Sequence, residues 1–331
     1  CNQWLIMITV FYRQDNIIQS KKLDEKETIP ENTLWIDVES ASTHDLDLIQ
    51  KNCAIQLPSK SDVWKNNVLN RLYIEDSIAY MTAAIITKHE SPYPNISAVT
   101  FILTPSSLIT IRDISPTSFN VLASRLLSLP NTFKTSSQLL EGLLGEMITR
   151  VAYNMEVVEE TLDNFSHRIF AGEDSEKERK TTSQMMKNTL KSMGTCADLN
   201  SKMNESLHSI NRLLHFFKRT VPAASELDKN IGILISDTSE LTQQTNFAAD
   251  KISFQLNALL GMINIEQNMI IKIFSVVSVF FLPPTLVASM YGMNFKHMPE
   301  LDWAKGYPMA LIIMMLFAVL PYIYFRRKGW L

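Results

Sequence analysis

Cysteine and glycine are scarce in this chain, whose 331 residues include three cysteines and nine glycines. Cys1, Cys53 and Cys196 lie far apart and form no CxxC pair, so they supply neither a disulfide framework nor a metal motif. Isolated cysteines of this kind are typical of reduced thiols in a cytosolic protein. The sequence also lacks a GxxxxGKS or GxxxxGKT phosphate loop, an HExxH pair and a recognisable nucleophile motif. We therefore expect no nucleotide-driven step and no enzyme.

A strong charge of either sign is also missing, because the net charge is only −3. A nucleic-acid partner would favour a basic face, so we expect none. The apolar stretch 5–12 has neither a basic segment before it nor a small-residue cleavage site after it. It is therefore predicted to be a first strand rather than a signal peptide. Met7 is expected to be the natural start, with residues 1–6 upstream of it.

Two long apolar runs stand near the C-terminal end of the chain. Residues 273–290 and 307–325 contain no charged side chain, and each is about long enough for a helix to cross the hydrocarbon core of a bilayer. Lys272 precedes the first run, and the basic residues 326–328 follow the second. The short loop between the runs has balanced charges. The positive-inside rule therefore predicts that both termini are cytoplasmic and that the loop is outside.

The sequence before these runs changes character near residue 134. Up to that point, short runs rich in β-branched and aromatic residues are separated by turn signals, which predicts an α+β domain. Thr43 is expected to cap a first helix, and a second helix is expected over 59–70. The predicted strands cover 7–12, 17–20, 33–38, 72–74, 78–87, 96–103 and 108–112.

From Ser136 onwards, apolar residues recur at every third or fourth position, which predicts helices to about residue 169 and again to about residue 220. Ser225 is expected to cap a last helix that continues into the first apolar run. That helix would cover roughly 65 residues, or about 95 Å at 1.5 Å per residue. So long a helix needs partners along its apolar stripe, from upstream helices or from identical helices of other copies.

The predicted architecture is an α+β cytosolic domain on long stalk helices, anchored by two transmembrane helices. We expect a multi-pass protein of the inner (plasma) membrane. The predicted parts are the α+β domain (1–134), the helical stalk (135–271), the first transmembrane helix (272–294), an extracytoplasmic loop (295–306), the second transmembrane helix (307–325) and a basic cytosolic tail (326–331).

Small hydroxyl residues mark one face of the first span: Ser275, Ser278, Thr285 and Ser289. They could permit close helix packing and bond to their own backbone. They could also form a lightly polar pore stripe, which two helices per chain can enclose only in an oligomer. Pro283-Pro284 frees carbonyl groups that neighbours or water must satisfy, which favours a pore without deciding between the two interpretations.

The segment that follows the first span carries the most specific motif in the chain, Gly292-Met293-Asn294 after Tyr291. Related signals surround it: FLPPTLVAS at 281–289, MPEL at 298–301 and GYP at 306–308. Together they resemble the signature of the CorA family of magnesium channels, in its bacterial branch. The resemblance is dense over about the last 75 residues. It is looser upstream, for instance at 110–113.

The resemblance implies a homopentamer in the lipid bilayer, with five first spans around a pore and a cytosolic funnel. Gly292, Met293 and Asn294 would form the selectivity filter at the outer mouth, with Glu300 in the loop beside it. Mg²⁺ dehydrates reluctantly. A ring of Asn294 amide oxygens can accept hydrogen bonds from its waters, and such weak binding allows release. Gly292 would permit a tight exit from the helix.

The resemblance also implies a path for divalent cations down one face of the first span, with a hydrophobic gate among its lower apolar members. Mg²⁺ would be the transported ion and the cytosolic regulator, and Co²⁺ and Ni²⁺ are possible further cargo. The implied pore-lining residues are Asn268, Ile271, Phe274, Ser278, Leu282 and Thr285.

The sequence leaves alternatives open for the regulatory site and for the transported ion. Asn257 stands where some relatives carry an acidic residue, so no regulatory metal site is assigned. The acidic stripe of Glu156, Glu159, Glu160 and Asp163 is either a cation sensor or a solvated helix face. A zinc transporter of the same family is a second possibility, although Met293 favours magnesium. A membrane-anchored coiled-coil scaffold without transport is a third, and neither the proline pair nor the Gly292-Met293-Asn294 motif fits it.

Overall fold

The computed structural model divides the chain into two compact units, Cys1–Leu256 and Asn257–Leu331. Each unit is described by itself. The structure describes residues 8–15, 17–23, 27–40, 42–53, 55–57, 72–87, 94–170, 179–221, 227–293, 298–299, 303 and 305–328.

A seven-stranded sheet forms the centre of the first unit, with the strand order β2-β1-β3-β7-β6-β5-β4. Neighbouring strands are antiparallel except for β3 and β7, which run parallel at the middle of the sheet. The predicted α+β class and the positions of all seven predicted strands are confirmed. The strands are β1 (Ile8–Gln14), β2 (Ile17–Lys22), β3 (Thr33–Glu39), β4 (Leu72–Glu75), β5 (Ile78–Thr87), β6 (Asn95–Leu103) and β7 (Leu108–Arg112).

The first helix, α1 (Thr43–Cys53), lies where the sequence predicts it, but its cap is different. The Ser42 hydroxyl accepts a hydrogen bond from the Asp45 amide at 3.2 Å, and the Asp45 carboxylate accepts one from the Ser42 amide at 2.8 Å. This reciprocal pair is a capping box. The prediction of Thr43 as the cap was therefore wrong, and Ser42 has that role. The helix predicted over 59–70 lies outside the described residues.

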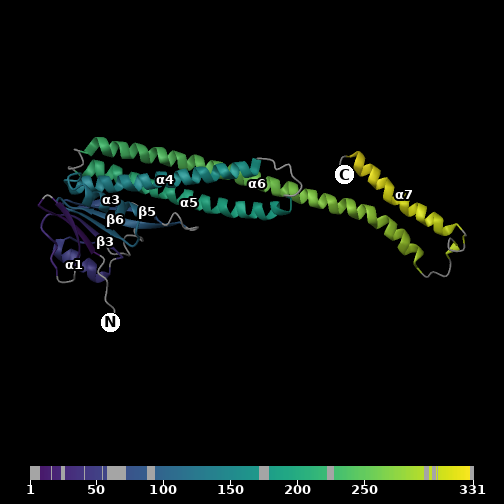
Figure 1. Cartoon of the computed structure of the whole chain (residues 1–331), viewed down its shortest axis with the longest axis horizontal. Coiled ribbons are helices and arrows are strands. Elements are labelled where there is room, and N and C mark those ends of the chain that lie inside the picture. Colours follow the sequence, from purple (N-terminus) through teal and green to yellow (C-terminus); the bar gives the residue numbers. More distant parts are fainter. Residues whose placement is uncertain are drawn as a thin grey trace. The chain divides into compact units, whose positions relative to one another are not determined.

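Helices cover both faces of the sheet (Figure 1). On one face α1 buries Ile49 against the strand residues Ile36 and Ile109. On the other face lie α3 (Thr117–Ser128), α4 (Ser136–Phe170) and α5 (Arg179–Thr220), where Trp35 and Phe119 are completely buried. The sequence did not predict α3, which lies in the transition from strands to long helices.

The longest helix, α6 (Asp228–Tyr291), confirms the predicted continuous helix of about 65 residues, with 64. Within the first unit, polar side chains hold it to its neighbours. The amide of Gln255 donates to the carbonyl of Leu162 in α4 at 2.8 Å, and the amide of Asn200 in α5 donates to the carbonyl of Thr245 at 2.9 Å. Up to Leu256, α6 therefore has upstream helices as partners.

Cys196 in α5 provides a chemical test of this packing. Burial raises the pKa of its thiol to about 11, and only the thiolate is an effective nucleophile. We expect alkylation by iodoacetamide at pH 8 to be about 100-fold slower at Cys196 in the folded chain than in the urea-unfolded chain. Mass spectrometry of the modified peptides measures both rates. Equal rates would contradict the packing of α5 described here.

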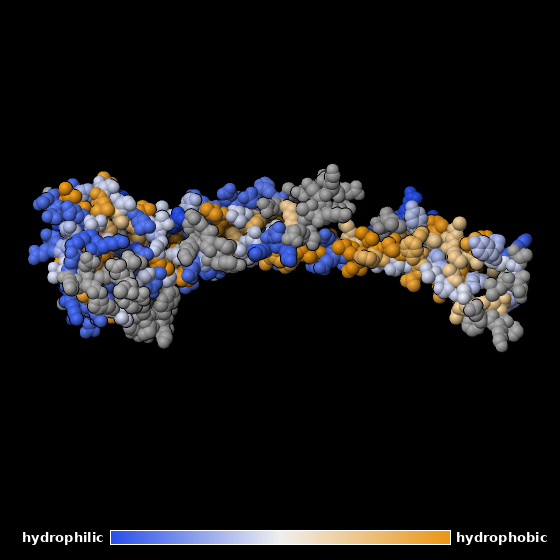
Figure 2. All heavy atoms as spheres, turned by 60° about the horizontal axis from the view of Figure 1, so that its bottom comes forward, coloured by the Kyte–Doolittle hydropathy of each residue, from blue (hydrophilic) through white to orange (hydrophobic). Residues whose placement is uncertain are grey.

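The second unit contains the C-terminal part of α6 and the helix α7 (Gly306–Arg327). Both helices are long and apolar enough to cross a membrane. In the apolar window of each, 0% and 6% of the residues are buried in the single chain. Figure 2 shows hydrophobic side chains gathered over this part of the chain. So large an exposed apolar surface requires lipid or other protein chains to cover it.

Candidate ion pathway

The six residues that the sequence assigns to a pore wall lie on one face of α6. At 100° per residue, Asn268, Ile271, Phe274, Ser278, Leu282 and Thr285 occupy about a third of the helix circumference. All six are exposed in the single chain, and the apolar members Ile271, Phe274 and Leu282 are 62%, 68% and 66% exposed. The side chains of this face are therefore mostly uncovered in the single chain. Its role as a pore wall stays a prediction.

Two hydroxyl groups on this face are bonded to the helix itself. Ser278 donates to the carbonyl of Phe274 at 2.9 Å, and Thr285 donates to the carbonyl of Phe281 at 2.7 Å. A hydroxyl has one donor hydrogen and two acceptor lone pairs. Since the hydrogen is used by the backbone, the oxygen presents only acceptor capacity outwards. Acceptors of this kind suit the water molecules around a cation, whose hydrogens point away from the ion.

The proline pair adds further acceptors without ending the helix. Pro283 and Pro284 lie inside α6 and lack the N–H groups that would otherwise bond the carbonyls of Val279 and Phe280. These carbonyls need donors from neighbouring chains or from water in a bilayer.

At the C-terminal end of α6, the Gly292 amide donates to the carbonyl of Ala288 at 3.0 Å and to that of Ser289 at 3.2 Å. The φ angle of Gly292 lies outside the left-handed region, and an added Cβ would lie 3.4 Å from the Ala288 carbonyl oxygen. The turn therefore does not use a left-handed glycine conformation, and the role of Gly292 in permitting a tight exit from the helix stays a prediction. Met293 is 50% exposed. Asn294 and Glu300 lie outside the described residues.

The acidic stripe of α4 is exposed and does not form a metal cluster. Asp163 pairs with Lys251 of α6 at 2.6 Å, and the hydrogen bond and charge of Lys251 lower the pKa of that carboxyl group. Glu156, Glu159 and Glu160 are exposed. Among the described residues, no group of three or more His, Cys, Asp or Glu side chains is placed to hold a metal ion. The solvated-face interpretation of the stripe is therefore the better supported one.

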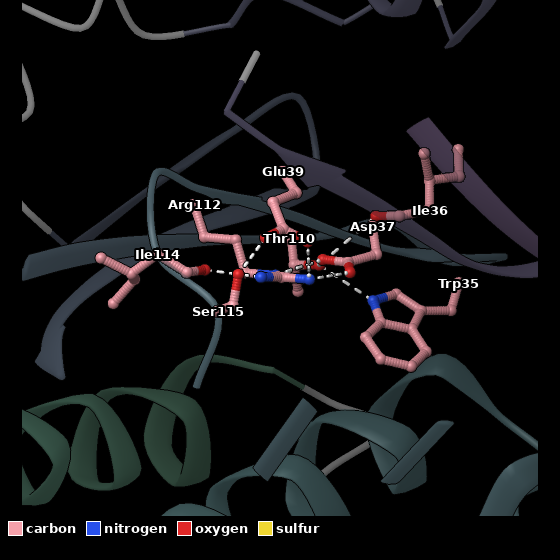
Figure 3. A network of polar contacts seen from close by, with 8 residues as sticks. All are labelled: Trp35, Ile36, Asp37, Glu39, Thr110, Arg112, Ile114 and Ser115. Atoms are coloured by element: carbon pink, nitrogen blue, oxygen red, sulfur yellow. Dashed lines mark hydrogen bonds and ion pairs between the residues drawn. The ribbon is translucent and has the colours of Figure 1, made fainter. Parts of the chain in front are cut away.

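A polar network that the sequence did not predict lies inside the first unit, between the parallel strands β3 and β7 (Figure 3). Arg112 donates from Nε to Asp37 Oδ1 at 3.0 Å and from Nη2 to Asp37 Oδ2 at 2.7 Å. Its Nη2 also donates to Glu39 Oε2 at 2.8 Å. Thr110 donates to Asp37 Oδ1 at 2.7 Å and accepts from Trp35 Nε1 at 2.9 Å.

The surroundings of Arg112 keep it charged although only 4% of its side chain is exposed. Burial alone would lower the pKa of Arg112, but the hydrogen bonds and charges of Asp37 and Glu39 raise it. The guanidinium also lies over the ring of Phe119 in α3, with its carbon 4.6 Å from the ring centre. It donates to the carbonyl of Ile114 at 2.5 Å. The network thus connects the middle of the sheet to the start of α3.

Comparisons with known proteins agree with these features over nearly the whole chain. The sequence model of one family, described as CorA-like Mg²⁺ transporter protein, matches residues 30–327. The magnesium transport protein CorA of Haemophilus influenzae is 30% identical over 325 residues, which cover 98% of this chain and 100% of that protein. CorA of Escherichia coli K12 is 29% identical with the same coverage. In fold, the complete CorA magnesium transporter of Methanocaldococcus jannaschii matches with a TM-score of 0.74 at 19% identity, covering 98% of this chain and 99% of that one.

Proposed function

The chain belongs to the CorA family of Mg²⁺ transporters, and we propose that it forms a channel through which Mg²⁺ enters the cell down its electrochemical gradient. The observation that carries this proposal is the exposed face of α6 that ends at Gly292 and Met293. It combines hydroxyl oxygens with exposed apolar side chains, and it leads to the motif that we propose as the filter because of its resemblance to the family signature. A scaffold helix needs neither feature.

The membrane potential supplies the driving force for this uptake. Each elementary charge that crosses an inside-negative potential of about 100 mV gains about 2.3 kcal/mol, so a divalent cation gains roughly twice that. No nucleotide is needed. In the proposed orientation, both termini are in the cytoplasm of a cell whose inner membrane contains α6 and α7, and the loop 295–306 is outside.

Five copies of the chain are proposed to surround the pathway. One first span and one second span cannot enclose a water-filled path, whereas five copies of the α6 face can. Leu282, Phe274 and Ile271 would then form apolar rings that close the path by dewetting. Asn294 and the loop residue Glu300 would meet the hydrated ion outside.

Cargo and regulation follow from the same proposal. Mg²⁺ is the proposed cargo, with Co²⁺ and Ni²⁺ as further cargo, and cytosolic Mg²⁺ is proposed to close the channel when it is abundant. No regulatory residue is assigned, because Asn257 is not acidic and Asp163 already pairs with Lys251. Zinc transport is the second candidate within the family, and Met293 argues against it.

The test is ion flux into liposomes that contain the purified full chain, with an inside-negative potential and a Mg²⁺-sensitive dye inside. We expect Mg²⁺ uptake that stops when the potential is removed and the Mg²⁺ concentrations are equal. Native mass spectrometry in detergent should give five chains per particle. Absence of flux for Mg²⁺, Co²⁺, Ni²⁺ and Zn²⁺ would support the scaffold, flux of Zn²⁺ alone would support a zinc transporter, and a monomer or dimer would exclude the pore.

A further inference from the structure

A small polar cavity lies in the first unit, among α3, α4, α5 and the end of β5. Its volume is about 40 Å³, enough for roughly three water-sized particles or one small ion. It is lined by residues that take no part in the proposed ion pathway. Its polar lining residues include Thr87, Thr117, Ser118, Arg150, Asn154 and Ser206.

Two of these residues have buried polar atoms that lack a partner among the described residues. They are Oδ1 of Asn154 and Oγ of Ser206, whose residues are 1% and 0% exposed. Buried polar groups in folded proteins are nearly always hydrogen-bonded to protein, water or a ligand. Two such groups at one cavity therefore indicate that something polar occupies it.

The Ser206 hydroxyl differs from other helical hydroxyls of this unit. Thr149 and Thr161 in α4 donate to the carbonyls four residues before them, at 2.9 Å and 2.7 Å. This is the usual way for a hydroxyl inside a helix to use its hydrogen. Ser206 makes no such bond, so its hydrogen remains available to an occupant of the cavity.

The start of α3 contributes positive potential to the same cavity. Pro116 precedes the helix without a side-chain cap, and the first turn contains no acidic residue. The first-turn N–H groups of Thr117 and Ser118 have no acceptor within the helix, and they form the positive end of its dipole. Arg150 also lines the cavity from α4, with its guanidinium carbon 5.0 Å from the centre of the Tyr153 ring, and no acidic side chain is among the described lining residues.

We propose that this cavity is a binding site for a small monovalent anion of the size of chloride. The Ser206 hydroxyl donates to the anion, and so does the Asn154 amide once its NH₂ group is turned into the cavity, which a half-turn of the side chain achieves. The first-turn N–H groups of α3 supply the remaining attraction. A bound anion would hold α3, α4 and α5 together at the sheet and would make the stability of this unit depend on chloride.

Bromide, a heavy substitute for chloride, locates the site directly. Crystals of the full chain grown in sodium bromide should show an anomalous scattering peak inside the cavity, next to Ser206. The Ser206→Ala variant should lose it. Water alone in the cavity would overturn the proposal, and so would bromide found only at the protein surface, which would be an adventitious ion only.

Thermal unfolding of the full chain in detergent gives a second readout. At constant ionic strength, replacing gluconate by chloride at ten times the dissociation constant should shift the unfolding equilibrium about tenfold towards the folded state. Ser206→Ala should bind chloride about tenfold more weakly and lose most of this shift. The matched control Ser201→Ala, at an exposed position of α5, should keep it. An equal chloride effect in both variants would overturn the proposal.

Discussion

Replacing Asn294 by alanine is expected to reduce Mg²⁺ uptake into liposomes by roughly 60-fold or more. Each amide oxygen of the proposed ring accepts a hydrogen bond from a water of the hydrated ion, worth at least about 0.5 kcal/mol. Loss of five such bonds amounts to about 2.5 kcal/mol, and every 1.4 kcal/mol is a factor of about ten in occupancy. Alanine offers no acceptor in its side chain, so the variant cannot hold the hydrated ion at the mouth.

The loss should be specific to the position of Asn294. Asn164→Ala, an exposed asparagine of α4, is the matched control and should leave the flux unchanged. Asn294→Asp distinguishes binding from conduction. A ring of carboxylates binds Mg²⁺ more tightly, so the apparent affinity should rise while the maximal flux falls because release is slower. Uptake by Asn294→Ala equal to that of the unchanged chain would refute the filter.

Local sequence patterns, such as helical periodicity and alternation in strands, predicted most helices and strands of this fold. The continuity of α6 follows from an uninterrupted helical pattern that leads into an apolar run, and the seven strands follow from short β-branched segments bounded by turn residues. These predictions depend only on neighbours along the chain. The residues of the candidate pathway were instead assigned by the family resemblance. Helical spacing adds that they share one face of α6, and their role as a pore wall stays a prediction.

Features that depend on contacts between distant segments were not predicted. Arg112 meets Asp37 only because β3 and β7 are adjacent and parallel, and no local pattern specifies that pairing. The cap of α1 was misplaced by one residue although the sequence carried a signal for it. Ser42 has the acidic Asp45 three positions on, as in a capping box, whereas Thr43 has Leu46 there. A sequence signal for the network did exist, because polar residues alternate with apolar ones at the ends of both strands: Asp37 and Glu39 in β3, and Thr110 and Arg112 in β7.

Replacing Arg112 by methionine is expected to destabilise the first unit by about 3–5 kcal/mol, because it leaves the carboxylate of Asp37 buried without its counter-charge. For a unit of this size, such a loss lowers the midpoint of thermal unfolding by roughly 6–20 °C. Tryptophan fluorescence follows the unfolding, and Trp35 contributes to the signal from inside the network, since its indole donates to Thr110 and stacks on Phe11 at 4.7 Å.

Two further variants separate the loss of the charge pair from the loss of an arginine. Arg125→Met removes an exposed arginine that pairs with Glu146 at 3.1 Å, and a surface pair of this kind contributes at most about 1 kcal/mol. The double variant Arg112→Met with Asp37→Leu should recover most of the lost stability, because a buried ion pair replaced by apolar side chains is often neutral. If Arg112→Met lowered the stability of the first unit no more than Arg125→Met does, the network would be a solvated contact. If the double variant stayed as unstable as Arg112→Met, the cost would come from the lost bonds to Ile114 and Glu39 rather than from the unpaired charge of Asp37.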